Sequence, residues 1–294
     1  MELFSYNKKI CVVTGSSSNI GLSLIQKLVH DGAIVYSLDL KKINIDGIIS
    51  IYCDFNKKES IDQAFTQIPE HIDAFFGIAS VSGLSHDYYS TFTINFIAYK
   101  YIAEEYLHIR MNKGSSICFV TSMAGIHYDE YSAEFKDFIV AKHWDDEIQM
   151  LHQFSKNHPI GISAFVLAHR ALNYYTLFAS NWLGKDSIRV NAILPAIQNN
   201  LTQYDSSILQ TGNSSHKFST SDIVNPLLFL NSDAASYLSG ICLPIDSGES
   251  ALLTIGKKHD FFQMKTKSKL FHLNVISNNI QKKISDETPN EEII

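Results

Sequence analysis

Near its N-terminus the chain carries a glycine segment with the spacing of a phosphate-binding loop. Residues 14–21 read TGSSSNIG, directly after an apolar run and at the start of a stretch with helical periodicity. Glycine lets the backbone approach a pyrophosphate, and the following helix offers free N–H groups and the positive end of its dipole. Asn19 stands where glycine is usual, and asparagine tolerates a left-handed backbone. The segment predicts a nucleotide phosphate site, and a tight strand–helix turn without a ligand is the alternative.

Two acidic residues end the next two apolar runs. Asp39 lies 18 positions after Gly21. A carboxylate at this place suits hydrogen bonds to the adenosine ribose hydroxyls and repels a 2′-phosphate, which favours NAD(H) over NADP(H). Lys41 and Lys42 follow closely, and Asp39 can also simply end a strand. Asp54 either receives the adenine amino group or caps the helix expected to start near residue 56.

These residues lie at the ends of alternating strand and helix patterns. Seven short apolar runs rich in β-branched residues predict strands at 9–14, 33–38, 48–53, 73–78, 115–121, 188–193 and 241–245. Helical periodicity covers 20–31, 57–67, 91–111, 162–183 and 220–231. Apolar strands that alternate with helices predict a parallel sheet covered on both faces. We therefore expect an α/β fold: a Rossmann-type, doubly wound, seven-stranded parallel sheet with helices on both faces.

Composition narrows the class of protein. The 294 residues are 45% apolar, so most of the chain can bury a core. The net charge of −6 argues against a nucleic-acid-binding surface, and no apolar run is long enough for a membrane-spanning helix. The apolar run after residue 9 comes too early and is too short for a signal peptide. The cysteines Cys11, Cys53, Cys118 and Cys242 stand singly in apolar runs, which predicts buried thiols in a cytoplasmic protein without a metal site.

We expect one nucleotide-binding domain over residues 1–249, interrupted by an inserted helical hairpin at 126–159. Residues 250–294 form a C-terminal extension. Seven lysines and one acid lie between Lys257 and Lys283 of this extension, and the last ten residues are acidic. A partly ordered, solvated segment is the simpler interpretation, and a membrane-surface or partner-binding role for the lysines is the alternative.

Over residues 8–248 the chain resembles the short-chain dehydrogenase/reductase family. The glycine loop is similar to the T-G-x-x-x-G-x-G segment of that family, and Asp39 and Asp54 match its ribose and adenine positions. Ser80, in Ile78-Ala79-Ser80, replaces a glycine of the family motif. Further landmarks follow in order: Arg189-Val190-Asn191 with Pro195, similar to R-V-N-x-x-x-P-G, and Asp246-Ser247-Gly248, similar to the terminal D-G-G. The inserted hairpin is similar to that of the 3α-hydroxysteroid dehydrogenase/carbonyl reductase subgroup, where it covers a face that other members use for dimerisation.

The resemblance implies a set of functional residues and NAD as cofactor. Asn95 and Ser122 match the asparagine and serine of the family's catalytic tetrad. The residues expected at the cofactor are Gly15, Ser17, Asn19, Ile20, Gly21, Asp39, Asp54, Ala79, Asn95, His169, Pro195 and Ile197. Asn200 takes the place of a threonine that contacts the nicotinamide, and residues 198–217 are expected to form a lid over a small apolar substrate. A homo-oligomer is compatible with the sequence.

The chain departs from the family at the proton donor. The family has a tyrosine followed four residues later by a lysine, and here Phe165 and His169 occupy these positions. Phe165 lies 26 residues before Asn191, a spacing that suits the helix and the strand after it. No tyrosine in the chain has a lysine four residues on. Phenylalanine has no proton to give, and loss of a general acid commonly costs about 10²–10⁴ in rate. The lysine, by its charge, would lower the pKa of the tyrosine, whereas a histidine is mostly neutral at pH 7.

Two interpretations of function follow. The first is an NAD(H)-binding family member with impaired catalysis. The second is an active NAD-dependent oxidoreductase on an apolar ketone, alcohol or hydroxysteroid-like substrate, with a substitute acid such as His169 or a water held by Ser122 and Asn95. His127, Tyr128 and Tyr131 follow Ser122 closely, and they either reach the cleft or pack within the insert. The sequence alone leaves both interpretations open.

Overall fold

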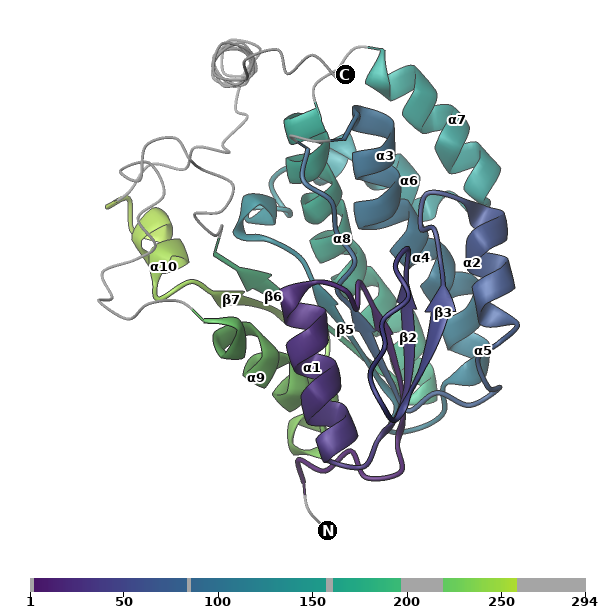
Figure 1. The fold of residues 1–294 in the computed structure, drawn as a ribbon. Helices are drawn as coiled ribbons and strands as arrows, with labels where there is room; N and C mark the ends of the chain where they lie inside the picture. The colour runs from purple at the N-terminus through teal and green to yellow at the C-terminus, as the bar shows by residue number, and fades with distance from the viewer. Residues whose placement is uncertain (1–2, 84–85, 157–160, 197–218, 258–294) are drawn as a thin grey trace, which may run out of the picture.

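Seven parallel strands form one sheet in a computed structural model that describes residues 3–83, 86–156, 161–196 and 219–257. Their order across the sheet is β3-β2-β1-β4-β5-β6-β7 (Figure 1). The strands are β1 (Ile10–Thr14), β2 (Ile34–Asp39), β3 (Ile48–Tyr52), β4 (Ala74–Gly77), β5 (Ser116–Val120), β6 (Arg189–Pro195) and β7 (Cys242–Ile245). Each lies within two residues of a predicted run, and the predicted fold class is confirmed.

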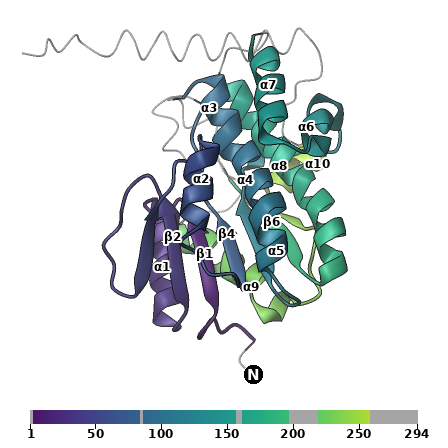
Figure 2. The same ribbon diagram turned by 90° about the vertical axis from the view of Figure 1, so that its right-hand side faces the viewer.

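Helices cover both faces of this sheet (Figures 1 and 2). On one face lie α1 (Asn19–His30) and α9 (Thr220–Asn231), whose apolar residues pack against β1, β4 and β5. On the other face lie α2 (Lys58–Phe65), α8 (Gly161–Leu183) and the helical run from residue 88 to residue 110. That run consists of α3 (Tyr88–Phe92), α4 (Ala98–Ile102) and α5 (His108–Arg110), joined by the π-helical turns η1 (Thr93–Ile97) and η2 (Ala103–Leu107). Within the described ranges, no helix has the length and apolar character needed to cross a membrane.

The strand order reverses at the centre of the sheet, where β1 has β2 on one side and β4 on the other. In open α/β sheets this reversal separates the loops that follow the two central strands and leaves a crevice at the carboxyl edge. β1, β4 and β5 are buried almost throughout, which explains why their sequences are continuous apolar runs. The loops after β1 and β4 are therefore the loops that the fold brings to a ligand site.

The arginine and asparagine of β6 hold the connection to the last strand. Arg189 donates from Nη1 to the Leu230 carbonyl (2.5 Å) and from Nη2 to the Ser232 carbonyl (2.9 Å), both at the end of α9. Asn191 donates to the Leu238 carbonyl at 2.9 Å. These buried bonds fix α9 and β7 to β6, so the Arg189-Val190-Asn191 segment has a structural role here.

The segment after β5 forms an additional helical layer. It contains the 3₁₀ turns η3 (Met123–Gly125) and η4 (Ser132–Glu134), then α6 (Lys136–Val140) and α7 (Trp144–Ser155), in the region of the predicted hairpin. Its aromatic side chains pack on the helical run of the core: the His152 and Tyr89 rings stack at 4.9 Å, and Trp144 meets Tyr101 edge-on at 5.4 Å. The insert thus lies over α3 and α4.

Candidate functional site

The glycine loop makes a tight turn directly after β1. Gly15 has φ +66°, and a Cβ at this residue would lie 2.6 Å from the Cα and the nitrogen of Ala79. Ser18 caps α1, because its Oγ accepts from the Gly21 N–H (3.1 Å) and donates to the Gly15 carbonyl (2.8 Å). Asn19, Ile20 and Gly21 form the first turn of α1. The loop therefore brings the helix N-terminus to the carboxyl edge of the sheet, the geometry in which anions bind.

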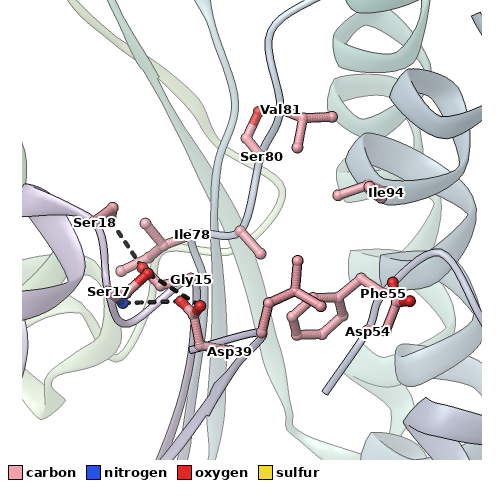
Figure 3. A pocket seen from close by; sticks show the side chains of 12 residues that line it. Gly15, Ser17, Ser18, Asp39, Asp54, Phe55, Ile78, Ser80, Val81 and Ile94 are labelled. Carbon is pink, nitrogen blue, oxygen red and sulfur yellow. Dashed lines mark hydrogen bonds between the residues drawn. The ribbon is translucent and has the colours of Figure 1, made fainter. Parts of the chain in front are cut away.

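Asp39 ties the end of β2 to the glycine loop. Its carboxylate accepts the Ser17 N–H (2.9 Å), the Ser17 hydroxyl (3.0 Å) and the Lys41 N–H (2.9 Å). Figure 3 shows the Asp39 side chain turned toward Ser17. Asp39 is only 9% exposed, but it still borders a pocket. The carboxylate predicted to recognise a ribose thus also fixes the shape of the loop.

A pocket of about 220 Å³ opens between the ends of β1, β2 and β4. Its walls are Gly15, Ser17, Ser18, Asp39, Leu40, Asp54, Phe55, Ile78, Ala79, Ser80, Val81 and Ile94. In Figure 3 Ser17 and Asp39 lie on one side of it, and Phe55, Asp54 and Ile94 lie on the other. The structure brings five of the predicted cofactor residues to one pocket: Gly15, Ser17, Asp39, Asp54 and Ala79. The pocket combines the polar groups of Ser17 and Asp39 at one wall with the apolar side chains of Phe55 and Ile94 and the Asp54 carboxylate at the opposite wall.

Sequence reasoning missed the apolar lining of this pocket. Leu40 and Phe55 each follow a predicted acidic residue by one position, and this adjacency was the available signal. Asp54 itself accepts the Asn56 N–H at 3.0 Å and pairs with Lys57 at 3.1 Å. It closes the turn before α2 and does not cap the helix, whose N-cap is Lys57. Asp54 is therefore both a pocket residue and a turn residue.

Asn95 fixes the segment that extends β4 along the pocket. Its side chain accepts from the Val81 N–H and donates to the Val81 carbonyl, both at 2.9 Å. It is fully buried in the π-helical turn η1, and such turns are frequent at functional sites. Two further residues assist it: Thr14, the first residue of the glycine segment, accepts from the Ile78 N–H (2.9 Å), and Tyr99, which had no sequence signal, donates to the Ala79 carbonyl (2.6 Å). Asn95 thus positions the pocket wall through the backbone.

Ser122 follows β5 and starts the turn that packs against α8. The residue is 6% exposed, and its Oγ accepts from the Ala124 N–H at 3.1 Å. At the end of this turn, a Cβ on Gly125 would lie 2.7 Å from the carbonyl carbon of His169, and Asn173 donates to the Gly125 carbonyl at 3.0 Å. The structure therefore places the turn of Ser122 directly against the helical turn of His169.

Phe165 and His169 form one contact on α8. Their rings meet edge-on with centroids 4.3 Å apart, as residues one helical turn apart can. His169 is 2% exposed, and within the described part of the chain neither ring nitrogen has a hydrogen-bond partner. Burial lowers the pKa of His169 to about 3, so the imidazole is neutral at pH 7. Neither residue offers an acidic proton at neutral pH.

The buried imidazole gives a testable dependence of stability on pH. Because the pKa of His169 is lowered in the folded protein, the unfolded chain binds the extra proton, and this residue costs stability as pH falls below about 6.5. We expect His169→Leu to reduce the loss of unfolding free energy between pH 7 and pH 5 by about 2 kcal/mol. Denaturant unfolding at both pH values measures it. Equal losses in the variant and the wild type contradict a buried neutral His169.

The tyrosines after Ser122 pack against the core, Tyr131 on Arg170 of α8 and Tyr128 beside Cys242 of β7. The Arg170 guanidinium lies 3.8 Å from the centre of the Tyr131 ring, and both side chains are buried. Tyr128 and His127 are half-buried. Pro195 ends β6 and pairs with Ile245 of β7. Ile197, Asn200, the expected lid at 198–217 and the extension from residue 258 onward lie outside the described residues.

Comparisons with known proteins agree with this geometry. Residues 9–134 match the family model described as short chain dehydrogenase. The chain is 26% identical over 258 residues to a coniferyl-alcohol dehydrogenase from Pseudomonas sp. strain HR199. The alignment covers 82% of this chain and 96% of the relative. It is 22% identical over 254 residues to the 3-oxoacyl-[acyl-carrier-protein] reductase MabA of Mycobacterium bovis, over 81% and 91% of the two chains.

Solved structures show the same fold. A 3α-hydroxysteroid dehydrogenase from Pseudomonas sp. B-0831, determined in complex with NADH, superposes with a TM-score of 0.65 at 15% identity, over 84% of this chain and 99% of its own. A levodione reductase superposes with a TM-score of 0.63 at 20% identity, over the same shares. The family match over residues 9–134, the relatives and the seven-stranded sheet agree: this chain is similar in sequence to short chain dehydrogenases and has the fold of these solved structures.

Proposed function

We propose that this protein binds NAD(H) in the pocket after β1 and is impaired in the proton transfer of its family. The observation that carries the proposal is the contact between Phe165 and His169 on α8. One ring has no ionisable group, and the other is a buried neutral imidazole. These residues stand where the family has its proton-donating tyrosine and the lysine that assists it.

The residues around the pocket suit a dinucleotide. The N-terminus of α1 and the loop N–H groups favour a pyrophosphate, and the Asp39 carboxylate favours ribose hydroxyls over a 2′-phosphate. Phe55, Val81 and Ile94 offer apolar surface for a flat base. Neither ring nitrogen of His169 has a partner among the described residues, and a group that bonds one of them would remove the free-energy cost of a buried unpaired polar atom. When bound, the nicotinamide would accept or give a hydride.

The remaining polar residues do not replace the missing acid. Both the oxygen and the nitrogen of the Asn95 amide are hydrogen-bonded to the backbone of Val81. The Ser122 Oγ accepts from the Ala124 N–H, which leaves its hydroxyl free to donate to a substrate oxygen, but a serine is a poor acid. His169 is a neutral imidazole at pH 7, so it lacks the acidic proton of an imidazolium. We therefore assign Ser122 and Asn95 to orientation and expect slow proton transfer.

An active oxidoreductase is the second candidate, and the likeness to the coniferyl-alcohol dehydrogenase favours it. In this alternative His169, or a water held by Ser122 and Asn95, moves the proton to or from an apolar alcohol or ketone. A panel of aromatic and steroid alcohols and carbonyls, with coniferyl alcohol among them, distinguishes the two. Rapid turnover that is lost in Ser122→Ala and His169→Ala supports the alternative. NADH binding without turnover supports impaired catalysis.

The cofactor half of the proposal is tested by fluorescence titration with NADH and NADPH. The wild type is expected to bind NADH more tightly than NADPH. Asp39→Asn is expected to weaken NADH binding by about 10–100-fold, because hydrogen bonds to a charged group contribute about 1.5–3 kcal/mol. Asp46→Asn removes the same charge at an exposed position between β2 and β3 and serves as the control. Failure to bind either nucleotide, or equal effects of the two variants, contradicts the proposed site.

A further inference from the structure

A buried ion cluster joins the insert to the core. Lys100, on α4, is 2% exposed, and its ammonium lies 2.8 Å from a carboxylate oxygen of Glu104 and 2.8 Å from one of Glu147. It also donates to the Ala141 carbonyl, between α6 and α7, at 2.6 Å. Glu147, in the first turn of α7, is itself 2% exposed. The cluster therefore connects three parts of the fold: α4, η2 and the insert.

The charges of this cluster do not balance. One ammonium faces two carboxylates, and a buried excess negative charge is costly. Glu104 is the better supported of the two, because the Tyr175 hydroxyl on α8 donates to it at 3.1 Å in addition to Lys100. The Glu104 side chain is also 26% exposed, against 2% for Glu147. Glu147 is thus the carboxyl on which a proton removes the most unfavourable charge.

The groups around Glu147 also favour its protonated form. Burial, assisted by the charges of Glu104 and Asp146, raises the pKa of Glu147 to about 8, and Lys100 is the cation that opposes this rise. Burial also raises the pKa of Glu104, with Glu105 nearby. The pKa of Tyr175 is raised above its ordinary value by burial, so its hydroxyl stays protonated. Among the described residues, these are the charged and titratable groups recorded around the cluster from α4, η2, α7 and α8.

We propose that Glu147 is a proton-binding site that links the docking of α7 on the core to pH. With a proton on Glu147 the cluster is neutral, and α7 stays in place. When the proton leaves, one ammonium must balance two buried carboxylates, and release of α7 lets Glu147 return to water. Because the docked helix binds the proton more tightly than the released one, docking weakens as pH rises between about 4.5 and about 8.

Docking of α7 reaches the candidate site through the helix that carries Asn95. α7 lies beside α3 in both ribbon views and packs on α3 and η1 (Figures 1 and 2). Release of α7 removes the stack of His152 on Tyr89 and the contact of Trp144 with Tyr101. Asn95 lies in η1 and holds Val81 at the pocket wall. Gain or loss of the proton on Glu147 is therefore expected to change the position of η1 and, through Asn95, of the pocket wall at Val81.

The first test reads the proton directly on the full chain. The infrared difference spectrum between the wild type and Glu147→Gln isolates the carbonyl band of a protonated Glu147 carboxyl. We expect this band at pH 7 and its loss as pH passes about 8. Absence of the band at pH 7, with Glu147 titrating near its ordinary value, overturns the proposal even if the variant is destabilised.

The second test reads the docking of α7 by hydrogen exchange of its amides at matched pH values. The ratio of wild-type to Glu147→Gln exchange rates cancels the intrinsic effect of pH. We expect this ratio to rise on the order of 50-fold between pH 6 and pH 8, from the pKa values of the docked and released carboxyl. Asp145→Asn removes an exposed charge from the same helical turn and should behave like the wild type. A ratio that stays constant with pH overturns the proposal.

Discussion

The double substitution Phe165→Tyr with His169→Lys is expected to speed alcohol oxidation or carbonyl reduction about 10²–10⁴-fold over the wild type. The tyrosine returns a group that can give or take a proton, and the lysine charge lowers the pKa of that tyrosine. The two positions are one helical turn apart and their rings already touch, at 4.3 Å between centroids. The measurement is kcat with NAD(H) over the alcohol and carbonyl panel described above, for wild type and double variant.

Single variants and a third substitution make this experiment decisive. Phe165→Tyr alone is expected to gain little, because its neighbour stays a neutral imidazole with a pKa of about 3. Adding Ser122→Ala to the double variant should remove most of the gain. His169→Lys puts an ammonium at a buried position, so all rates are compared at saturating nucleotide, with NADH binding checked by titration. No gain in a double variant that binds NADH contradicts the proposed cause of impairment.

Gly15→Ala is expected to cost about 2–5 kcal/mol of unfolding free energy and to abolish NADH binding. The left-handed backbone costs a residue with a Cβ about 1–2 kcal/mol, and forced overpacking costs about 1–3 kcal/mol more. Here the new Cβ would meet backbone atoms of Ala79 at 2.6 Å, and backbone cannot rotate away as a side chain can. Denaturant unfolding and NADH titration measure the two effects.

Substitutions at two other glycines separate the cost of the left-handed backbone from the cost of overpacking. Gly114 has φ +95° with no atom within 4 Å of the added Cβ, so Gly114→Ala reports the backbone cost alone. Gly184 has neither a positive φ nor a close neighbour, so Gly184→Ala reports neither cost. If Gly15→Ala loses no more stability than Gly114→Ala and still binds NADH, the loop does not approach β4 as tightly as described.

Local patterns were sufficient to predict the sheet and part of the site. Strands buried on both faces appear in the sequence as apolar runs, and Asp39 was recognised because it ends one of them. The predicted helix at 91–111 is present, but its π-helical turns at 93–97 and 103–107 have no local signature. A π-helical turn rotates the side chains that follow it relative to an α-helix. The turn at 93–97 contains Asn95, which must bond Val81, and this contact depends on tertiary structure and not on the local sequence.

Long-range chemistry was beyond the reach of sequence patterns. Nothing in the sequence near Lys100 indicates Glu147, because the contact depends on how α7 folds back over the core. The loss of partners at His169 likewise follows from the burial of α8 and not from its periodicity. Ser17 was predicted to meet a cofactor, but its hydrogen bonds to Asp39 became visible only when β2 was placed beside β1.

The end of α9 bears on how the chain can be shortened or synthesised. Besides the bonds from Arg189, Asn231 donates to the Phe75 carbonyl of β4 (3.0 Å), and Ser116 of β5 donates to the Asn231 carbonyl (2.8 Å). Three central strands thus depend on residues 230–232 to satisfy buried polar groups. A fragment that stops after β6 loses the acceptors of the Arg189 guanidinium and of the Ser116 hydroxyl together with the helix that covers them, so we expect the sheet to form stably only in a chain that includes α9.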